Sequence, residues 1–175
     1  MSFGACPADA KSLRKEAVMK RIMNMIIVGV MMIAPTAAAF AADIHALDRV
    51  SVLMPRDRVA SLLGAPDKAD QITGGLKVDL YTVDVADSLV GAGYIYEDEG
   101  ALAGNALIFR GNVAKRMAER LKEIGFILLD EEGSSFRLSG KDDDTGQPIV
   151  VTIGENNDLT TVMTFEKGFY DRRVK

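Results

Sequence analysis

The stretch MPRDRVASLLGAPD, residues 54–67, decides how the first half of this chain folds. Proline suits the first turn of a helix, and Pro55 stands where such a turn would begin. The apolar residues that follow recur at the i, i+3, i+4 spacing of a helix with one buried face: Val59, Leu62 and Leu63. Gly64 occupies a position that favours a left-handed residue, and Pro66 prevents the helix from continuing. The stretch therefore predicts a short helix that ends abruptly.

Three runs with a two-residue period follow this helix, at residues 76–84, 89–98 and 101–110. Such alternation of apolar and polar side chains is typical of half-buried strands. In the second run, Tyr94 and Tyr96 fall on the same face. Glycine weakens the interior of a strand, so we expect a bulge or a close backbone contact at three positions: Gly91, Gly93 and Gly104. The pattern predicts a meander of three antiparallel strands joined by short turns.

The strongest helical pattern of the chain covers residues 112–124. Asn112 suits the N-cap, and Gly125 suits the position after the last turn. The apolar face of this helix comprises Val113, Met117, Leu121 and Ile124, and the opposite face is charged. We expect this apolar face to pack on residues of the following strands, among them Phe126, Leu128 and Met163.

Four further strands are predicted in quick succession, at residues 126–130, 135–139, 148–153 and 159–165. The segments between them are rich in turn-forming residues. Residues 55–109 and 112–166 thus share one order, a helix followed by a meander. Helices on one face of an antiparallel sheet make an α+β architecture. We expect one layered α+β domain over residues 42–175, built from two helix-plus-antiparallel-meander halves.

The average composition conceals a leader that differs from the rest of the chain. The chain has 175 residues and a formal net charge of −4, but its first 41 residues are net positive and the remainder carries −7. From Met19, two basic residues precede a mostly apolar run at residues 22–34, and an A-x-A pattern ends at Ala41. This layout is typical of a cleavable signal peptide. We expect residues 19–41 to be that peptide, with cleavage between Ala41 and Ala42, and residues 1–18 to precede the true translation start. Ala37-Ala38-Ala39 offers a second cleavage site.

The leader also indicates a compartment. Its apolar run is shorter than the ~20 residues that a membrane-spanning helix needs. The single cysteine, Cys6, precedes this run, so it cannot be the lipidated cysteine of a bacterial lipoprotein. We therefore expect a periplasmic or secreted product with no stable membrane anchor after cleavage. A mature chain without cysteine suits an oxidising compartment and excludes disulfides, thiol nucleophiles and cysteine-based zinc sites.

The residues offer little for catalysis. His45, the only histidine, lies close to the predicted mature N-terminus. The motifs G-x-S-x-G and H-E-x-x-H and a phosphate-binding glycine loop do not occur in the sequence. Three adjacent acids at 97–99 could in principle serve as paired carboxylates, but their place at a hairpin tip favours a solvated turn. We expect a protein that is not an enzyme and that needs no cofactor.

A metal site is conceivable in one loop, residues 140–146. Its three consecutive carboxylates, Asp142, Asp143 and Asp144, are oxygen ligands of the kind that Ca²⁺ prefers. The spacing does not fit an EF-hand, because Lys141 would then occupy the first ligand position. An acidic turn in an acidic protein is the interpretation that we favour, with the loop kept as a weak candidate.

Nucleic acid is a poor candidate partner. A mature chain of net charge −7 repels phosphate, and the basic residues of the 112–124 helix are interspersed with acidic ones. A second basic cluster, Arg172-Arg173 with Lys175, is short. We expect no nucleic-acid binding.

Part of the chain resembles the SmpA/OmlA family of bacterial outer-membrane assembly lipoproteins. The resemblance lies in a short helix with the pattern V-x-x-L-L-G-x-P-D, then a strand with Tyr81, then strands around the turn Glu99-Gly100. Its nine-residue pattern is formed by Val59, Leu62, Leu63, Gly64, Pro66 and Asp67. The tandem halves are also similar to β-lactamase-inhibitor-type folds. Both resemblances imply a module that binds proteins, although this chain lacks the family's lipidated cysteine and adds a second half.

The sequence therefore predicts a non-enzymatic, exported protein-interaction module whose partner is another envelope or secreted protein. Aromatic residues make good anchors in interfaces, which makes Tyr81, Tyr94 and Tyr96 candidate binding residues. Buried packing is the competing role for each of them. The alternative function is a small-ligand binder or minor carboxylate-dependent hydrolase that uses the face of the sheet. An open apolar surface would favour protein binding, whereas a closed pocket with converging carboxylates would favour the alternative.

Overall fold

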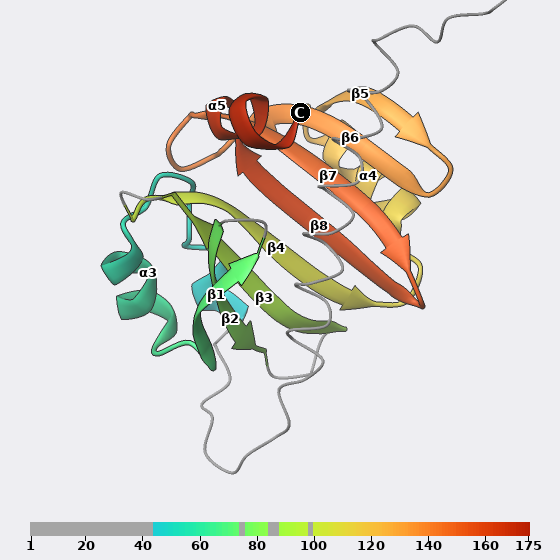
Figure 1. Ribbon diagram of the computed structural model, residues 1–175. Helices are drawn as coiled ribbons and strands as arrows, with labels where there is room; N and C mark the ends of the chain where they lie inside the picture. The colour runs from blue at the N-terminus through green and yellow to red at the C-terminus, as the bar shows by residue number, and fades with distance from the viewer. Residues whose placement is uncertain (1–43, 74–75, 84–87, 98–99) are drawn as a thin grey trace, which may run out of the picture.

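One antiparallel sheet runs through the part of the chain that the computed structural model describes, which is residues 44–73, 76–83, 88–97 and 100–175 (Figure 1). The predicted signal peptide and its cleavage site lie outside these residues. The sheet has eight strands in the order β1-β2-β3-β4-β8-β7-β6-β5. Together with a few helices this makes a mixed α and β fold in which the sheet dominates.

The first half comprises α2 (Ile44–Leu47), α3 (Arg56–Leu63), β1 (Lys68–Thr73), β2 (Leu76–Thr82), β3 (Leu89–Tyr96) and β4 (Leu102–Arg110). The second half comprises α4 (Ala114–Glu123), β5 (Ile127–Glu132), β6 (Ser135–Lys141), β7 (Pro148–Asn156), β8 (Leu159–Glu166), α5 (Lys167–Phe169) and the π-helical turn η2 (Tyr170–Val174). Each half is a four-stranded meander preceded by a helix. The last strands of the two meanders, β4 and β8, pair with each other and join the halves into one sheet.

The first helix and its end are as the sequence predicts. Pro55 precedes α3 in an extended conformation, and Gly64 follows it with φ of +84°. An L-residue with a side chain would be strained in that conformation, which explains the glycine. The predicted strands at 76–84, 89–98 and 101–110 are β2, β3 and β4.

Strand β1 was not predicted, so the first half has four strands instead of three. Its sequence, KADQIT, contains a single large apolar residue and lacks the alternation that marks a half-buried strand. It forms one edge of the sheet, and its pairing with β2 is interrupted by a bulge between Lys68 and Gln71. Polar composition and bulges are common in edge strands, because they discourage pairing with other chains.

The two faces of the sheet carry separate apolar clusters. On one face, α3 packs on a cluster that is centred on β2 and β3 and includes Val59, Tyr94 and Leu102. On the same face of the second half, α4 covers a cluster of β6 and β7 residues that includes Leu138 and Ile153. The opposite face bears a third cluster, with residues of β2, β3, β4, β7 and β8. The expectation that both halves place their main helix on one face is consistent with this arrangement.

The C-terminal segment folds back on that opposite face (Figure 1). Phe169, Tyr170 and Val174 are buried there, and the carboxylate of Glu166 accepts hydrogen bonds from the backbone N–H groups of residues 168 and 169. From the sequence, this segment was expected only to be a basic tail. Its buried residues are spaced by one and four positions, which suits a helical turn. The three charged residues at 171–173 make this apolar pattern difficult to recognise in the sequence.

Helix α4 differs from its prediction in how it packs. The residues buried against the sheet are Ala114 and Ala118, while Met117 and Leu121 are half-buried and Ile124 is 69% exposed. Small side chains let the helix lie close to the strands, so the larger residues are displaced to one side of the contact. Phe126 and Leu128 pack with this cluster as expected, but Met163 belongs to the opposite face of the sheet. The expected contact between α4 and Met163 was therefore wrong.

Candidate functional site

The three candidate tyrosines lie in the core beneath α3. Tyr81, Tyr94 and Tyr96 are each at most 2% exposed. Tyr81 and Tyr94 contact each other edge to face, with ring centroids 5.5 Å apart. The structure thus places them in the packing role, and none of them is presented on an open surface.

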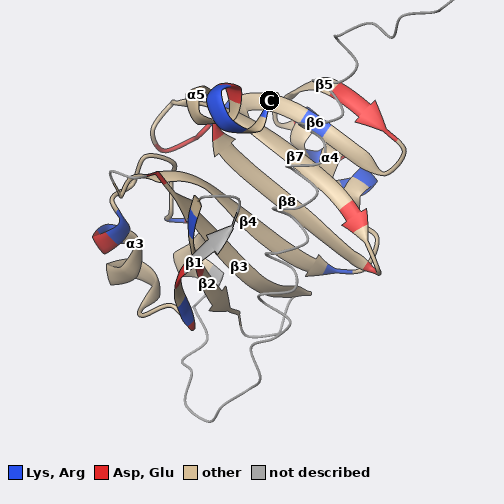
Figure 2. Ribbon diagram, viewed as in Figure 1, with Lys and Arg blue, Asp and Glu red and all other residues tan. Residues whose placement is uncertain are grey.

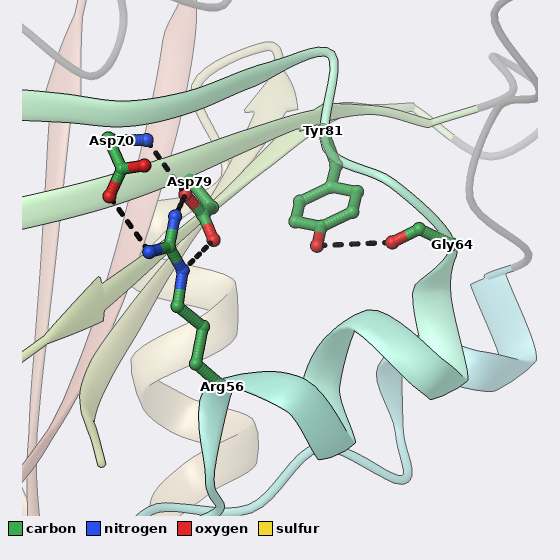
Figure 3. A network of polar contacts seen from close by, with 5 residues as sticks. All are labelled: Arg56, Gly64, Asp70, Asp79 and Tyr81. Carbon is green, nitrogen blue, oxygen red and sulfur yellow. Dashed lines mark hydrogen bonds and ion pairs between the residues drawn. The ribbon is translucent and has the colours of Figure 1, made fainter. Parts of the chain in front are cut away.

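An ion-pair network joins α3 to the sheet near the Tyr81 ring (Figure 3). Arg56 donates to both carboxylate oxygens of Asp79, at 2.8 Å and 2.6 Å, and to Asp70 at 2.8 Å. The N–H group of Asp70 also donates to Asp79, at 3.0 Å. The Arg56 guanidinium lies 5.4 Å from the centre of the Tyr96 ring, which suits a cation–π contact. Hydrogen bonds to Asp79 and Asp70 raise the pKa of Arg56. The hydrogen bond from Arg56 lowers the pKa of Asp70.

The tyrosine hydroxyls are held neutral in this region. Burial, together with the charge of Asp79, raises the pKa of Tyr81 to about 12, and burial raises the pKa of Tyr94 and Tyr96 as well. The Tyr81 hydroxyl donates to the carbonyl of Gly64 at 3.4 Å (Figure 3), whereas those of Tyr94 and Tyr96 have no partner among the described residues. Neutral, enclosed phenols and a clamped arginine stabilise the position of α3, and we assign this network a structural role.

The acidic loop at 140–146 does not gather its carboxylates. Asp142 accepts hydrogen bonds from the N–H and hydroxyl groups of Thr145, and Asp144 accepts one from the hydroxyl of Ser51 at 2.8 Å. Across the described ranges, no group of three or more His, Cys, Asp or Glu side chains is arranged to hold a metal ion. The candidate metal loop is therefore a turn that is stabilised by hydrogen bonds to Asp142 from within the loop. Asp144 joins it to the segment before α3. His45 is exposed in α2.

A groove opens on the helix-bearing face of the sheet, where β4 and β8 pass between α3 and α4. Its volume is about 810 Å³. Apolar side chains from β4, β7, β8 and α4 line it: Leu107, Phe109, Met117, Leu121, Ile124, Ile153 and Val162. We call this surface the α4 groove. Residues of the segment before α3 pack on the apolar clusters of both halves.

The floor of the α4 groove is unusual because it belongs to the central strands. On β4 and β8, residues that face the opposite side, such as Ala106 and Met163, are at most 1% exposed. Leu107, Phe109 and Val162, which alternate with them, are only half-buried. Charged residues lie only at the ends of these two strands (Figure 2). Two interior strands therefore leave an uncharged apolar strip open to solvent.

Among the described residues, the charged side chains that line the groove come from α4. Arg116, Arg120 and Glu123 complete its lining. Arg120 forms an exposed ion pair with Glu123 at 3.4 Å. Arg116 forms no ion pair with any described residue. The rim thus carries an excess of positive charge above an apolar floor.

A second cavity, of about 390 Å³, lies beside the β5–β6 turn. Its lining includes Arg137, whose guanidinium contacts Asp130 and the hydroxyl of Tyr170. The lining also includes Thr161, whose buried hydroxyl has no hydrogen-bond partner among the described residues. This cavity is smaller and more polar than the α4 groove.

Comparison with protein-family models, with curated proteins and with solved structures found no match to this chain. In the described part of the chain, no helix is both long enough and apolar enough to cross a bilayer.

The groove residues of β4 and β8 were not predicted as site residues, although the sequence contains a signal for them. The segments 106–109 and 162–165 include apolar residues on both faces of a strand, which predicts a strand covered on both sides. Only two main helices were predicted for one face of the sheet. The apolar residues of β4 and β8 therefore indicate more apolar surface than the two predicted helices would cover.

Proposed function

We propose that this chain is a non-enzymatic, exported protein-interaction module that binds its partner through the α4 groove. The observation that carries this proposal is the half-exposed apolar strip on β4 and β8, with Ile124 exposed at its edge. Interior strands are normally the most completely covered part of a sheet, and contiguous exposed apolar surface marks interaction sites. The groove is open, and Glu123 is the single carboxylate among the described residues that line it. These features support protein binding over hydrolysis.

Export, an association with the envelope and the α+β class are parts of the same proposal. The leader pattern supports export, and we expect the exported protein to begin at Ala42 or within three residues of it. N-terminal sequencing of periplasmic material tests this, and a protein that begins at Met1 or Met19 would contradict it. The resemblance to a family of outer-membrane assembly lipoproteins supports an envelope partner. Its motif residues Val59 and Leu63 are buried in α3, and Gly64 ends that helix.

Site-directed photocrosslinking tests the groove. The predicted mature chain has no cysteine, so Ile124→Cys creates a single attachment point for a photoreactive maleimide at the groove. Asp57→Cys, on the exposed side of α3, is the matched control. We expect a discrete adduct with one envelope protein from the first variant and none from the control. Val162→Arg, which places a charge on the groove floor, should abolish the adduct.

Binding by the purified partner completes the test. Ile124→Asp should weaken its binding at least tenfold without unfolding the chain, because Ile124 is 69% exposed. Equal crosslinking at both positions, or binding that Ile124→Asp and Val162→Arg leave unchanged, would show that the groove is not the interaction surface.

The unpartnered hydroxyl of Thr161 favours a second candidate function, the binding of a small polar ligand in the cavity beside the β5–β6 turn. Buried polar groups are nearly always hydrogen-bonded, and a ligand would supply the missing partner. A thermal-shift screen of small polar compounds tests this candidate. Stabilisation that Thr161→Val removes would support it, and no stabilisation by any compound would contradict it.

A further inference from the structure

The strands beneath the α4 groove cannot accept another strand. β4 is paired with β3 and β8 along its two edges, and β8 is paired with β4 and β7. An extended peptide in the groove would therefore lie on side chains, with its own N–H and C=O groups unpaired. A helix satisfies these backbone groups internally, so it can occupy an apolar surface without that cost.

The dimensions of the face also suit a helix. α3 packs mainly over β2 and β3, and α4 contacts β6 and β7. In the strand order of the sheet, these two positions are four strand spacings apart, or roughly 19 Å. Packed helices lie 8–10 Å from each other, so the gap has room for about one more helix. The groove follows α4 from Arg116 to Ile124, about 12 Å or two helical turns.

The positively charged rim of the groove favours an occupant with negative charge. Arg116 and Arg120 are four residues apart, so they project from the same side of α4, and both line the groove. Arg120 already has Glu123 as a partner, whereas Arg116 has no ion pair with a described residue. Acidic side chains on the occupant would meet these two guanidinium groups.

We propose that the α4 groove binds an amphipathic helix of a partner protein, with its apolar residues on β4 and β8 and its acidic residues against Arg116 and Arg120. This inference rests on the proposed function of the groove and specifies the class of partner. The occupant would lie between α3 and α4 as a third main helix on this face of the sheet.

Fluorescence anisotropy with designed peptides tests the proposal. The probe is a labelled 15-residue peptide with Leu at positions i, i+3, i+4 and i+7 and Glu on one flank. A peptide with Lys in place of Glu tests charge, and a scrambled peptide of the same composition tests spacing. Oleate is added as a competitor to test whether the groove instead takes an anionic lipid. We expect the Glu peptide to bind at least tenfold more tightly than the other two peptides, with no displacement by oleate.

Charge-reversal variants of the protein, measured with the same peptides, test the role of the two arginines. Arg116→Glu with Arg120→Glu should weaken the Glu peptide at least tenfold and strengthen the Lys peptide, and both changes should diminish at high salt. Equal binding of the Glu and Lys peptides, or tight binding of oleate alone, would overturn the proposal. Failure here together with a specific crosslink at position 124 would leave the groove as a protein-binding surface with a different class of partner. Failure of the crosslink would remove the proposed function itself.

Discussion

Arg56, at the start of α3, and Asp79, in β2, form a two-point ion pair that ties the first helix to the sheet. The Asp79 carboxylate is only 4% exposed, and the distances are 2.8 Å from Nε and 2.6 Å from Nη2 of Arg56. A planar guanidinium meeting both carboxylate oxygens fixes orientation as well as distance. The pair therefore determines where α3 lies over the tyrosine cluster.

Removing one partner of this pair should destabilise the protein strongly. Arg56→Ala leaves a buried carboxylate without its cation, and we expect the free energy of unfolding in urea to fall by about 3–5 kcal/mol. The double variant Arg56→Met with Asp79→Leu should lose less than Arg56→Ala, since it leaves no buried charge. Asp70→Asn is the control, because its carboxylate is exposed and should matter much less. If Arg56→Ala lowered the free energy of unfolding no more than Asp70→Asn, the Arg56–Asp79 pair would not hold α3 on the sheet.

The buried tyrosines predict a loss of stability at high pH. Burial raises the pKa of Tyr81 to about 12, and it raises the pKa of Tyr94 and Tyr96 too, whereas in the unfolded chain a tyrosine titrates near 10. Above pH 10 the unfolded state thus releases protons that the folded state retains. The stability that this provides is complete below pH 10 and is lost as the pH rises through 12.

Absorbance at 295 nm during an alkaline titration measures this effect. We expect phenolate from these three residues to appear together with unfolding, which far-ultraviolet circular dichroism follows. Tyr94→Phe should shift the transition to higher pH and change stability at pH 7 by less than ~1 kcal/mol, because the lost hydroxyl has no partner among the described residues. Ionisation of all tyrosines near pH 10 in a folded chain would contradict the burial.

Local signals in the sequence predicted most of the strands and both main helices. Pro55 and Gly64 bracket α3, and the turn residues Asn157 and Asp158 adopt positive φ between β7 and β8, because these effects act within a few residues. β1 was missed because an edge strand needs little apolar surface. The order of the strands also could not be read locally, since the pairing of β4 with β8 joins residues that are 49 to 61 positions apart.

The candidate site depends even more on tertiary packing. The tyrosines were proposed as anchors for their residue type, but α3 covers them, and the Arg56–Asp79 pair that holds α3 there joins residues 23 positions apart. Conversely, Leu107 and Val162 are apolar strand residues of the kind that usually lies in a core. They are half-exposed because α3 and α4 do not cover them. Exposure of an apolar residue depends on whether a neighbouring element covers it. Apolar residues on both faces of β4 and β8 indicate that both faces need a cover, but they do not show which residues the helices leave half-exposed.

Gly104 should be indispensable at the junction between the two halves. A Cβ atom at this position would lie 2.4 Å from the carbonyl oxygen of Thr164 and 2.7 Å from Cδ1 of Phe165, both on β8. A close backbone contact is one of the two alternatives, a bulge or a close contact, that the sequence predicted for this glycine. Gly104→Ala should reduce stability by at least about 1–3 kcal/mol, because the paired strands must move apart. The neighbouring Asn105→Ala should cost less than ~1 kcal/mol. Equal effects of the two changes in thermal unfolding would show that the junction is not tightly packed.

The start of α4 provides the last prediction, because its cap differs from the one that the sequence indicated. Val113 is the N-cap residue, and its own side chain cannot accept a hydrogen bond. Long-range partners supply the acceptors: the Glu155 carboxylate receives the N–H of Ala114 at 2.8 Å, and the Thr160 hydroxyl receives that of Val113 at 2.9 Å. Orphan N–H groups at a helix start need such acceptors, and both acceptors come from the β7–β8 hairpin.

Thr160→Val should therefore cost about 1–3 kcal/mol, since the buried hydroxyl also donates to the carbonyl of Gly111 at 2.7 Å and both partners would be left unsatisfied. Glu155→Ala should cost about 0.5–2 kcal/mol, the usual range for a lost cap. Asn112→Ala should change stability by less than ~0.5 kcal/mol, because Asn112 is exposed and lies before the cap. Urea unfolding of the three variants measures all of these values under one condition. A larger loss from Asn112→Ala than from Thr160→Val would mean that α4 begins one residue earlier and is capped locally, as its sequence alone suggested.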